Sequence, residues 1–529
     1  VDAKDQTPDQ RARTAATVIG ILGLTGDAAQ NLSSLVESER PYAVLAHDLT
    51  PDQSDAVRSA MSGTSPTAFG LILEPEELRQ YQQPGGAPGT TLAAHLLGFV
   101  NRQGQGQYGV EQYYQTQLAG KDTVVAAQQD GAGNRIPDTS TVLEQGYPGQ
   151  DIELTIDASL QMAVEQELLA AWIADRAARV SAVVLDPYSG EVYAYASYPS
   201  YNANDYQEIA NQDPSVFVDP IVSTVYEPGS VFKMMTATAA IGSGAVKPTT
   251  MFNDPGRLWL DKGLNHVDDA DKQPMPRMTF AHGIAFSRNV VAAQVALRLG
   301  KTTSAAAKAL YQTWLNLGFG ANTGIDVANE IPGILHNPAV TPWRQIDLAN
   351  GSFGQGMAVT PIQLAQAFSA MLNGGTLVQP RVVKAVGNQD TAAISKRRVM
   401  TPQLAQTLMQ IMKGVVTTVP FYRDRTLIPG FEVGGKTGTA QIWDTAKHDW
   451  KVNLFNYSFV GYIARNPGHP DLVVAVRIEE GKPTVIRQGH LEMPVMSFEL
   501  FRRIAHDAIT TPYLVPETQI VAPPPVSAP

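Results

Sequence analysis

The chain has 529 residues, 44% of them hydrophobic and 17% charged, which is typical of a globular protein with roughly two to four domains. Its formal net charge of −11 argues against a nucleic-acid-binding protein, since such proteins usually carry a basic face. Cysteine is absent, which excludes disulfides, iron–sulfur clusters and thiolate zinc sites, and the nine histidines show no metal-binding spacing. We therefore expect no metal, no cofactor and no nucleic-acid partner. No run of about 20 apolar residues occurs, so we expect no membrane-spanning segment in this chain.

The N-terminal part mixes helical patterns with loops rich in Gly, Gln and Pro, and none of its patterns is typical of catalysis. Residues 129–150 are polar and contain several Gly and Pro, as expected of a connection between domains. We therefore predict an N-terminal domain over residues 1–150.

From residue 151 the patterns indicate a domain with both strands and helices. Residues 151–157 alternate apolar and polar side chains, as a half-buried strand does, and residues 159–178 have helical spacing. Residues 181–200 form two strand-like runs around Pro187 and Gly190, which favours a hairpin.

Helical patterns dominate residues 275–375, with one helix predicted over 286–300, and the later part of the chain returns to strands. Strand patterns cover 431–443, 457–464 and 471–480, and an amphipathic helix is predicted over 494–509. Because strands at both ends enclose helices, we predict an α+β domain over residues 151–510, with one antiparallel sheet joining early and late segments. The Pro-rich residues 511–529 are expected to be a disordered tail.

One apolar helical pattern contains a lysine. The segment YEPGSVFKMMTATAAIGSG, residues 226–244, places Lys233 three residues after Ser230, so both side chains can lie on the same helix face. Burial lowers the pKa of a lysine, and a neutral lysine can take a proton from a serine at a helix N-terminus. The pattern S-x-x-K is weak by itself, because a capping serine and a lysine that reaches the surface would match it equally well.

Two further motifs follow in a fixed order. Ser287-Arg288-Asn289 and Lys436-Thr437-Gly438 come after Ser230 and Lys233, in the order S-x-x-K, S-x-N, K-T-G that serine β-lactamases and penicillin-binding proteins use. Residues 200–202 also match S-x-N, but they precede Ser230 and are interpreted as a loop. The ordered set predicts a serine acyl-enzyme site.

Each candidate residue has a chemical role. Ser287 can relay a proton between Lys233 and a leaving nitrogen, and Asn289 can bind a substrate amide. Lys436 offers positive charge to a substrate carboxylate, and Gly438 lets a peptide approach the strand closely and pair with it. The candidate groups that complete the site are the hydroxyls of Thr437 and Thr439 for substrate binding, and the backbone N–H groups of Ser230 and Thr439 as the oxyanion hole.

From about residue 90 to 510 the chain resembles class B penicillin-binding proteins, which are monofunctional peptidoglycan D,D-transpeptidases. The resemblance rests on YEPGSVFK, SRNVVAAQVALRLG, GSFGQGMAVTPIQLAQAFSAMLNGG and GGKTGTAQ. It implies a transpeptidase fold with a five-stranded antiparallel sheet flanked by helices, and an elongated N-terminal pedestal domain of the dimerisation type.

The resemblance also implies a reaction and its partners. Ser230 would attack a stem peptide ending in D-Ala-D-Ala, an amine acceptor would receive the acyl group, and β-lactam antibiotics would inhibit. The expected partners are a membrane-bound glycosyltransferase and divisome proteins. The expected location is the cell membrane, with a single-pass anchor and an extracytoplasmic catalytic domain. The YEPGS and SFGQG stretches resemble the cell-division subgroup more than the elongation subgroup, which stays the alternative.

Some features depart from the family pattern. Arg288 stands where the family often has Ser or Asp, and the anchor and an R-G-x-I-x-D-R-N-G stretch are missing, so we expect an ectodomain fragment that begins at Val1. A β-lactamase and a non-catalytic β-lactam sensor or scaffold remain alternatives. No glutamate after Asn289 begins the E-x-x-L-N stretch of class A β-lactamases, so a penicilloyl-enzyme is expected to hydrolyse slowly.

Overall fold

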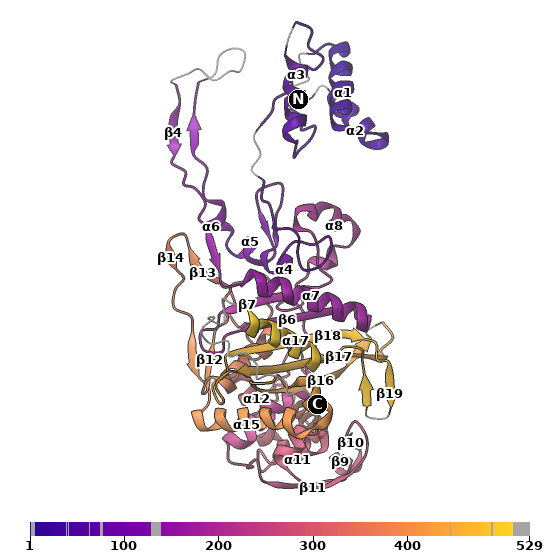
Figure 1. Ribbon diagram of the computed structural model, residues 1–529, viewed down its shortest axis with the longest axis vertical. Helices are drawn as coiled ribbons and strands as arrows, with labels where there is room; N and C mark the ends of the chain where they lie inside the picture. The colour runs from indigo at the N-terminus through magenta and orange to yellow at the C-terminus, as the bar shows by residue number, and fades with distance from the viewer. Residues whose placement is uncertain are drawn as a thin grey trace, which may run out of the picture. The chain divides into compact units, whose positions relative to one another are not determined.

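The computed structural model divides into two compact units, Val1–Gln80 and Tyr81–Pro529 (Figure 1). The structure describes the following residues: 1, 6–38, 40, 42–62, 64–74, 78–128, 139–444, 446–487 and 490–511. The predicted tail, residues 511–529, lies outside the described residues apart from Thr511.

The described residues of the first unit form three helices, α1 (Pro8–Leu22), α2 (Gly26–Glu37) and α3 (Pro51–Met61). Thr7 and Thr50 cap α1 and α3 through their side chains, and proline occupies the first position of both helices, where no N–H is needed. The helices bury a small apolar core that also includes residues of the following extended segments: Ala15, Val18, Leu32, Val36, Ala43, Val57, Ala68 and Leu71.

The second unit begins with short elements that precede its large sheet. They are α4 (Ala94–Leu97), β1 (Phe99–Val100), β2 (Gly106–Gln107), α5 (Gly109–Tyr113), α6 (Gln115–Ala119), β3 (Val124–Ala126) and β4 (Thr141–Glu144).

A buried carboxylate ties this leading segment to the first long helix, α7 (Ala158–Asp175). Glu165 of α7 accepts hydrogen bonds from the backbone N–H groups of Gly86 and Ala93, each at 2.7 Å. The contacts therefore divide the chain at 80/81, whereas the sequence analysis places a domain boundary at 150/151. Residues 81–128 and 139–150 belong to the same compact unit as the residues after 150, and the boundary at 150/151 stays a prediction.

The predicted five-stranded sheet is present, and all neighbouring strands are antiparallel. Its order is β16 (Glu432–Asp444), β17 (Asp449–Ala464), β18 (Leu472–Gly481), β6 (Arg179–Leu185) and β7 (Val192–Tyr198). Pairing of β18 with β6 joins the late strands to the early hairpin, as the sequence analysis expects. Because β16 is the first strand in this order, one of its edges has no partner strand in the sheet.

Helices cover both faces of the sheet. Side chains alternate along β6, so that Ala182 and Val184 pack in one apolar cluster and Val183 and Leu185 in another. The first cluster includes residues of α7 and of the closing helix α17 (Ser497–Thr510). Helices on the other face are α9 (Lys233–Gly242), α14 (Pro361–Leu372) and α15 (Pro402–Thr418).

The remaining helices of the second unit are α8 (Tyr206–Gln212), α10 (Phe280–Ala285), α11 (Asn289–Leu297), α12 (Thr303–Asn316), α13 (Gln345–Ser352), α16 (Pro420–Thr426) and the short 3₁₀ helices η1 (Ala203–Asp205), η2 (Pro214–Phe217), η3 (Gly229–Phe232) and η4 (Asp261–Gly263). The remaining strands are β5 (Ile152–Leu154), β8 (Met251–Asp254), β9 (Arg257–Leu260), β10 (Asn265–Asp268), β11 (Met275–Thr279), β12 (Thr376–Val378), β13 (Val383–Val386), β14 (Gln389–Asp390), β15 (Lys396–Arg398), β19 (Val485–Arg487) and β20 (His490–Glu492).

Three local predictions differ from the structure. The strand expected over 151–157 is the short β5, which pairs with β13 and not with the central sheet. The helix expected over 286–300 begins at Asn289, because Ser287 has a φ of 55°, in the left-handed region. The helix expected to begin near Ser230 starts as the 3₁₀ turn η3 and continues as α9 from Lys233.

Candidate active site

Three glycines let the turn that carries the candidate nucleophile Ser230, here called the nucleophile turn (η3, Gly229–Phe232), pack against the edge of the sheet. Ser230 follows Gly229, which has a φ of 59° and donates its N–H to Gly354 O at 3.0 Å. A Cβ atom on Gly229 would lie 2.7 Å from Thr439 O, and one on Gly354 would lie 2.2 Å from Gly229 O. A Cβ atom on Gly438 would lie 2.4 Å from the hydroxyl of a serine on β17. Glycine is therefore required where η3, the SFGQG loop and β16 approach one another.

Lys233 is fully buried, and its amine binds the S-x-N motif. Nζ donates to Ser287 O at 2.5 Å and to Asn289 Oδ1 at 2.7 Å, and it lies 3.2 Å from Ser287 Oγ. Burial, and next the charge of Lys436, hold the pKa of Lys233 well below its usual range. A neutral amine has two N–H donors, which the two oxygen acceptors use, and its lone pair remains to take a proton.

Lys436 reaches the same serine from β16. Its Nζ donates to Ser287 Oγ and to Thr437 O, both at 3.0 Å, and it lies 3.3 Å from Thr437 Oγ1. The side chain is fully buried, and burial lowers the pKa of Lys436 to about 7. Ser287 therefore lies between two lysine amines, as a proton relay requires.

The cleft in front of these amines brings together the other sequence-predicted residues. It has a volume of about 720 Å³, and its lining includes six of them: Ser230, Ser287, Asn289, Thr437, Gly438 and Thr439. Thr439 is exposed, whereas Thr437 is half-buried and its hydroxyl donates to the Tyr422 hydroxyl at 3.5 Å. Lys233 and Lys436 lie behind this surface and contact it through Ser287.

One expected contact is not made. In the described part of the chain no hydrogen bond joins Ser230 to Lys233, whose amine binds Ser287 and Asn289 instead. Catalytic hydrogen bonds often close only when substrate binds.

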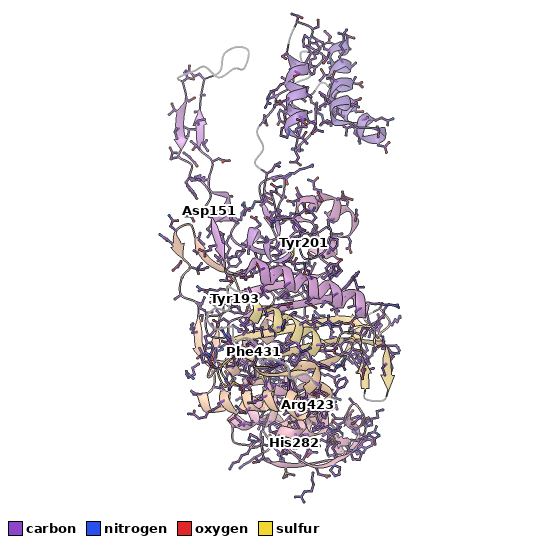
Figure 2. The ribbon with its side chains drawn as sticks, in the orientation of Figure 1. Asp151, Tyr193, Tyr201, His282, Arg423 and Phe431 are labelled. Atoms are coloured by element: carbon purple, nitrogen blue, oxygen red, sulfur yellow. The ribbon has the colours of Figure 1, made fainter. Side chains whose placement is uncertain are left out.

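The second S-x-N match, residues 200–202, lies elsewhere. Tyr201 is buried and donates its hydroxyl proton to Ala94 O at 2.9 Å. Figure 2 shows Tyr201 well apart from Arg423 of α16, a helix whose residues Phe421 and Tyr422 line the cleft. The expectation that this match is a loop outside the site agrees with its place.

Sequence reasoning missed two groups of cleft residues. Aromatic side chains from α16, β17 and α17 form part of the lining: Phe421, Tyr422, Phe455, Tyr457 and Phe498. Acidic residues at the end of β10 and directly after it also line the cleft: Asp268, Asp269 and Asp271. These residues come from segments far apart in sequence and match no motif, so no local signal could have indicated them.

A buried lysine pair that shares a serine, beside a nucleophile turn and a K-T-G edge strand, defines the class of serine acyltransferases and β-lactam-reactive proteins. A family model described as "Penicillin binding protein transpeptidase domain" matches residues 180–496, which is more than half of the chain. A second model, "Penicillin-binding Protein dimerisation domain", matches residues 3–154. The chain therefore belongs to the penicillin-binding protein transpeptidase family, with an N-terminal dimerisation domain.

Relatives with names support the same family. The chain is 32% identical over 515 residues to the penicillin-binding protein PbpB of Mycobacterium tuberculosis, covering 94% of this chain and 70% of that one. It is 28% identical to the peptidoglycan D,D-transpeptidase FtsI of Escherichia coli, covering 76% of this chain and 62% of that one. A crystal structure of penicillin binding protein 3 from Mycobacterium tuberculosis, complexed with aztreonam, aligns with a TM-score of 0.68 at 27% identity, covering 80% of this chain and 89% of that one.

Proposed function

We propose that this chain is a serine D,D-transpeptidase that cross-links peptidoglycan stem peptides through an acyl-enzyme on Ser230 and that β-lactams inhibit it covalently. The observation that carries the proposal is the fully buried amine of Lys233, bound to Ser287 and Asn289 beside the nucleophile turn. The family match and the relative named peptidoglycan D,D-transpeptidase support the same activity.

Acylation begins with proton transfer from Ser230 to Lys233. Ser230 Oγ bonds to the carbonyl carbon of the penultimate D-Ala while its proton moves to Nζ of Lys233. The backbone N–H groups of Ser230 and Thr439 stabilise the negative oxygen that forms. The carbon–nitrogen bond then breaks, Ser287 passes the proton on to the leaving nitrogen, and D-Ala departs.

Cross-linking runs the acylation steps in reverse, with an acceptor amine in place of the D-Ala that left. The acceptor amine attacks the ester carbonyl, gives a proton to the Lys233–Ser287 pair and forms an amide, and Ser230 regains its hydroxyl proton. The open edge of β16 offers backbone groups to which an extended peptide can add as a further strand. Lys436, Thr437 and Thr439 would bind the terminal carboxylate of the donor.

β-Lactam inhibition follows from the same attack. A β-lactam presents a strained amide and an anionic group to Ser230, but its leaving nitrogen stays tethered to the acyl group. An aztreonam complex of a relative supports binding of this class of drug. Because no glutamate after Asn289 is placed in an E-x-x-L-N stretch, we expect slow hydrolysis of the adduct, unlike in a β-lactamase.

The cellular setting is part of the proposal. We place the enzyme in septal cell-wall synthesis, held at the membrane by an anchor outside this sequence, with a glycosyltransferase and divisome proteins as partners. The presence of FtsI among the relatives supports the division role over the elongation role. In the described residues no helix is long and apolar enough to cross a membrane. The division into a pedestal over 1–150 and a transpeptidase domain over 151–510 belongs to the same proposal.

The test is intact mass after incubation with penicillin, followed by peptide mapping. We expect one adduct, on Ser230, that persists for far longer than a single turnover of a β-lactamase, and none in Ser230→Ala. Transfer of an acyl group from a D-Ala-D-Ala peptide onto an added D-amino acid separates a transpeptidase from a sensor. Adduct release within seconds with steady drug turnover would favour the β-lactamase alternative, and an adduct on another residue would contradict the nucleophile assignment.

A further inference from the structure

The middle residue of the S-x-N motif points into the protein and not into the cleft. Arg288 is only 4% exposed, and its guanidinium binds carboxylates from two segments. Nε lies 2.6 Å from Asp254 Oδ2, at the end of β8. Nη1 lies 2.9 Å from Asp271 Oδ2, Nη2 lies 3.2 Å from Asp269 Oδ2, and Nη2 also donates to Gln273 O. Through these ion pairs Arg288 joins the end of β8 to the segment that follows β10.

One of these carboxylates in turn holds the start of α11. Asp269 Oδ1 accepts the backbone N–H groups of Asn289 at 2.5 Å and of Val290 at 3.2 Å. No side chain at the cap position of α11 itself binds these donors. Asp268 O accepts from Asn289 Nδ2 at 3.0 Å, which turns Asn289 Oδ1 toward the amine of Lys233. The acidic segment therefore sets how Asn289 binds the base.

We propose that Arg288 is a positioning residue for the acylation step, which rests on the proposed transpeptidase function. By binding Asp269 and Asp254 it holds the acidic segment against the start of α11, and so fixes Ser287 and Asn289 around the amine of Lys233. Its positive charge also offsets the two carboxylates beside that amine. A serine or aspartate at this position could do neither, since both are shorter and carry no positive charge.

The charges around Lys233 predict the direction in which its pKa changes when Arg288 is replaced. The groups that act on its amine are Lys436 from β16, Arg288 beside the start of α11, and Asp254 and Asp269 from the β8–β11 region. The positive groups lower the pKa of Lys233, and the two carboxylates raise it. Further from the amine, Asp268 is paired with Arg257 at 2.6 Å and has His266 and Lys272 nearby. Loss of the Arg288 charge therefore raises the pKa of Lys233, so the amine becomes neutral only at higher pH.

The experiment measures the acylation rate with penicillin as a function of pH, by intact mass, for the wild type and four variants. The acidic limb of the profile is the pH range in which the rate rises as Lys233 loses its proton. In Arg288→Gln this limb should move to higher pH by ~1 unit, so that the rate at a given pH on the limb falls about tenfold. Arg288→Lys keeps the charge and should keep the limb within a few tenths of a unit of the wild-type value. Asp254→Asn should move the limb down, and the double variant Arg288→Gln/Asp254→Asn should return it toward the wild type.

A second buried arginine provides the matched control. Arg477 of β18 is also 4% exposed and binds Asn456 at 3.0 Å, but its charge is not among those that act on Lys233. Arg477→Gln should lower the melting temperature without moving the limb.

The outcomes separate the two proposals. Shifts of opposite sign in Arg288→Gln and Asp254→Asn support the inference. If Arg288→Gln fails to fold, a downward shift in Asp254→Asn together with an unmoved limb in Arg288→Lys supports it, and any other result in these two variants overturns it. If penicillin acylates the wild type but the acidic limb lies at the same pH in every variant, the role of Arg288 is overturned and the proposed function is not. A wild type that penicillin does not acylate at any pH overturns the proposed function as well.

Discussion

Lys233 and Lys436 share one hydrogen-bond partner: their Nζ atoms lie 3.2 Å and 3.0 Å from Oγ of Ser287. Both side chains are fully buried, so two ammonium groups at this separation would repel each other without the screening of water. The pKa of Lys233 lies well below its usual range and that of Lys436 is about 7. Lys233 is therefore a neutral base. Lys436 is a second amine, and a bound carboxylate would raise its pKa and so favour its positively charged form.

Replacement of the base tests this arrangement. Lys233→Arg keeps a positive charge that cannot be released near neutral pH, so Ser230 loses its proton acceptor. We expect the acylation rate with penicillin to fall by roughly 10²–10⁴-fold, while reversible binding of the drug changes far less. The control is Lys413→Arg at a half-exposed lysine that pairs with Glu432 at 2.6 Å, where acylation should be unchanged. Near-normal acylation by Lys233→Arg would reject the role of Lys233.

The second lysine is tested through the carboxylate that it would recognise. Lys436→Met removes the charge, and we expect the barrier to acylation by penicillin to rise by roughly 1–3 kcal/mol, the scale of a lost hydrogen bond between charged groups. A penicillin methyl ester has no carboxylate, so its already slower acylation should change much less. Stopped-flow acylation rates for the acid and the ester give the comparison. Equal losses for both compounds would show that Lys436 acts on the proton relay alone.

Ser287 shows what could and what could not be predicted from the sequence. The order of the three motifs led to eight candidate residues, and the structure places them around one cleft, while their roles stay predictions. The apolar pattern of residues 286–300 nevertheless favoured an uninterrupted helix, whereas Ser287 has a φ of 55° and its carbonyl oxygen binds Lys233. That backbone conformation is stabilised by a contact between segments far apart in sequence, which local propensity cannot contain.

The fold shows the same limit. Strand-like apolar runs indicated the strands β6 and β18, because a short apolar run is a local property of the sequence. Their pairing, with Ala182 opposite Val476, depends on the packing of the whole domain. The aromatic lining of the cleft likewise joins Phe421 of α16 and Phe498 of α17. Their rings lie edge to face with centroids 5.6 Å apart, although three strands of the sheet separate the two helices in sequence. Arg288 was noted as a departure from the family pattern, but its three carboxylate partners could not be read from the motif.

Close packing at the K-T-G strand gives a test on a glycine. In Gly438→Ala the new Cβ would lie 2.4 Å from Ser458 Oγ and 2.6 Å from Pro228 O, so the nucleophile turn and β16 must move apart. We expect a loss of about 1–3 kcal/mol of stability and a larger loss of acylation. The control is Gly414→Ala in α15, where no atom lies within 4 Å of the new Cβ and helix propensity should add up to ~1 kcal/mol. Thermal melting and penicillin labelling of both variants measure the two effects. A Gly438→Ala variant that is labelled at the wild-type rate would show that the close approach is dispensable.

A buried carboxyl group behind the cleft predicts how stability depends on pH. Asp175 ends α7 and is fully buried; its Oδ1 accepts the N–H of Val495 at 2.8 Å, and its Oδ2 makes no hydrogen bond among the described residues. Burial, and to a smaller extent Glu499, raise the pKa of Asp175 to about 7, while an unfolded aspartate titrates near 3.9. Between these values the folded state holds a proton that the unfolded state releases, so this group makes the protein less stable as pH rises from about 4 to 7.

Asp175→Asn removes that titration and keeps an oxygen acceptor for Val495. The variant should match the wild type most closely near pH 4, and its relative stability should increase with pH, reaching a gain on the order of 1–3 kcal/mol at pH 8. Denaturant unfolding at pH 5, 6, 7 and 8 measures the difference, with Asp424→Asn, at a side chain that is 73% exposed, as the control that should stay flat. The sign is the decisive feature, because a carboxylate that stabilised the fold would give a variant that weakens as pH rises. A difference that does not vary across this range would mean that Asp175 is ionised throughout and that the surrounding protein solvates its charge.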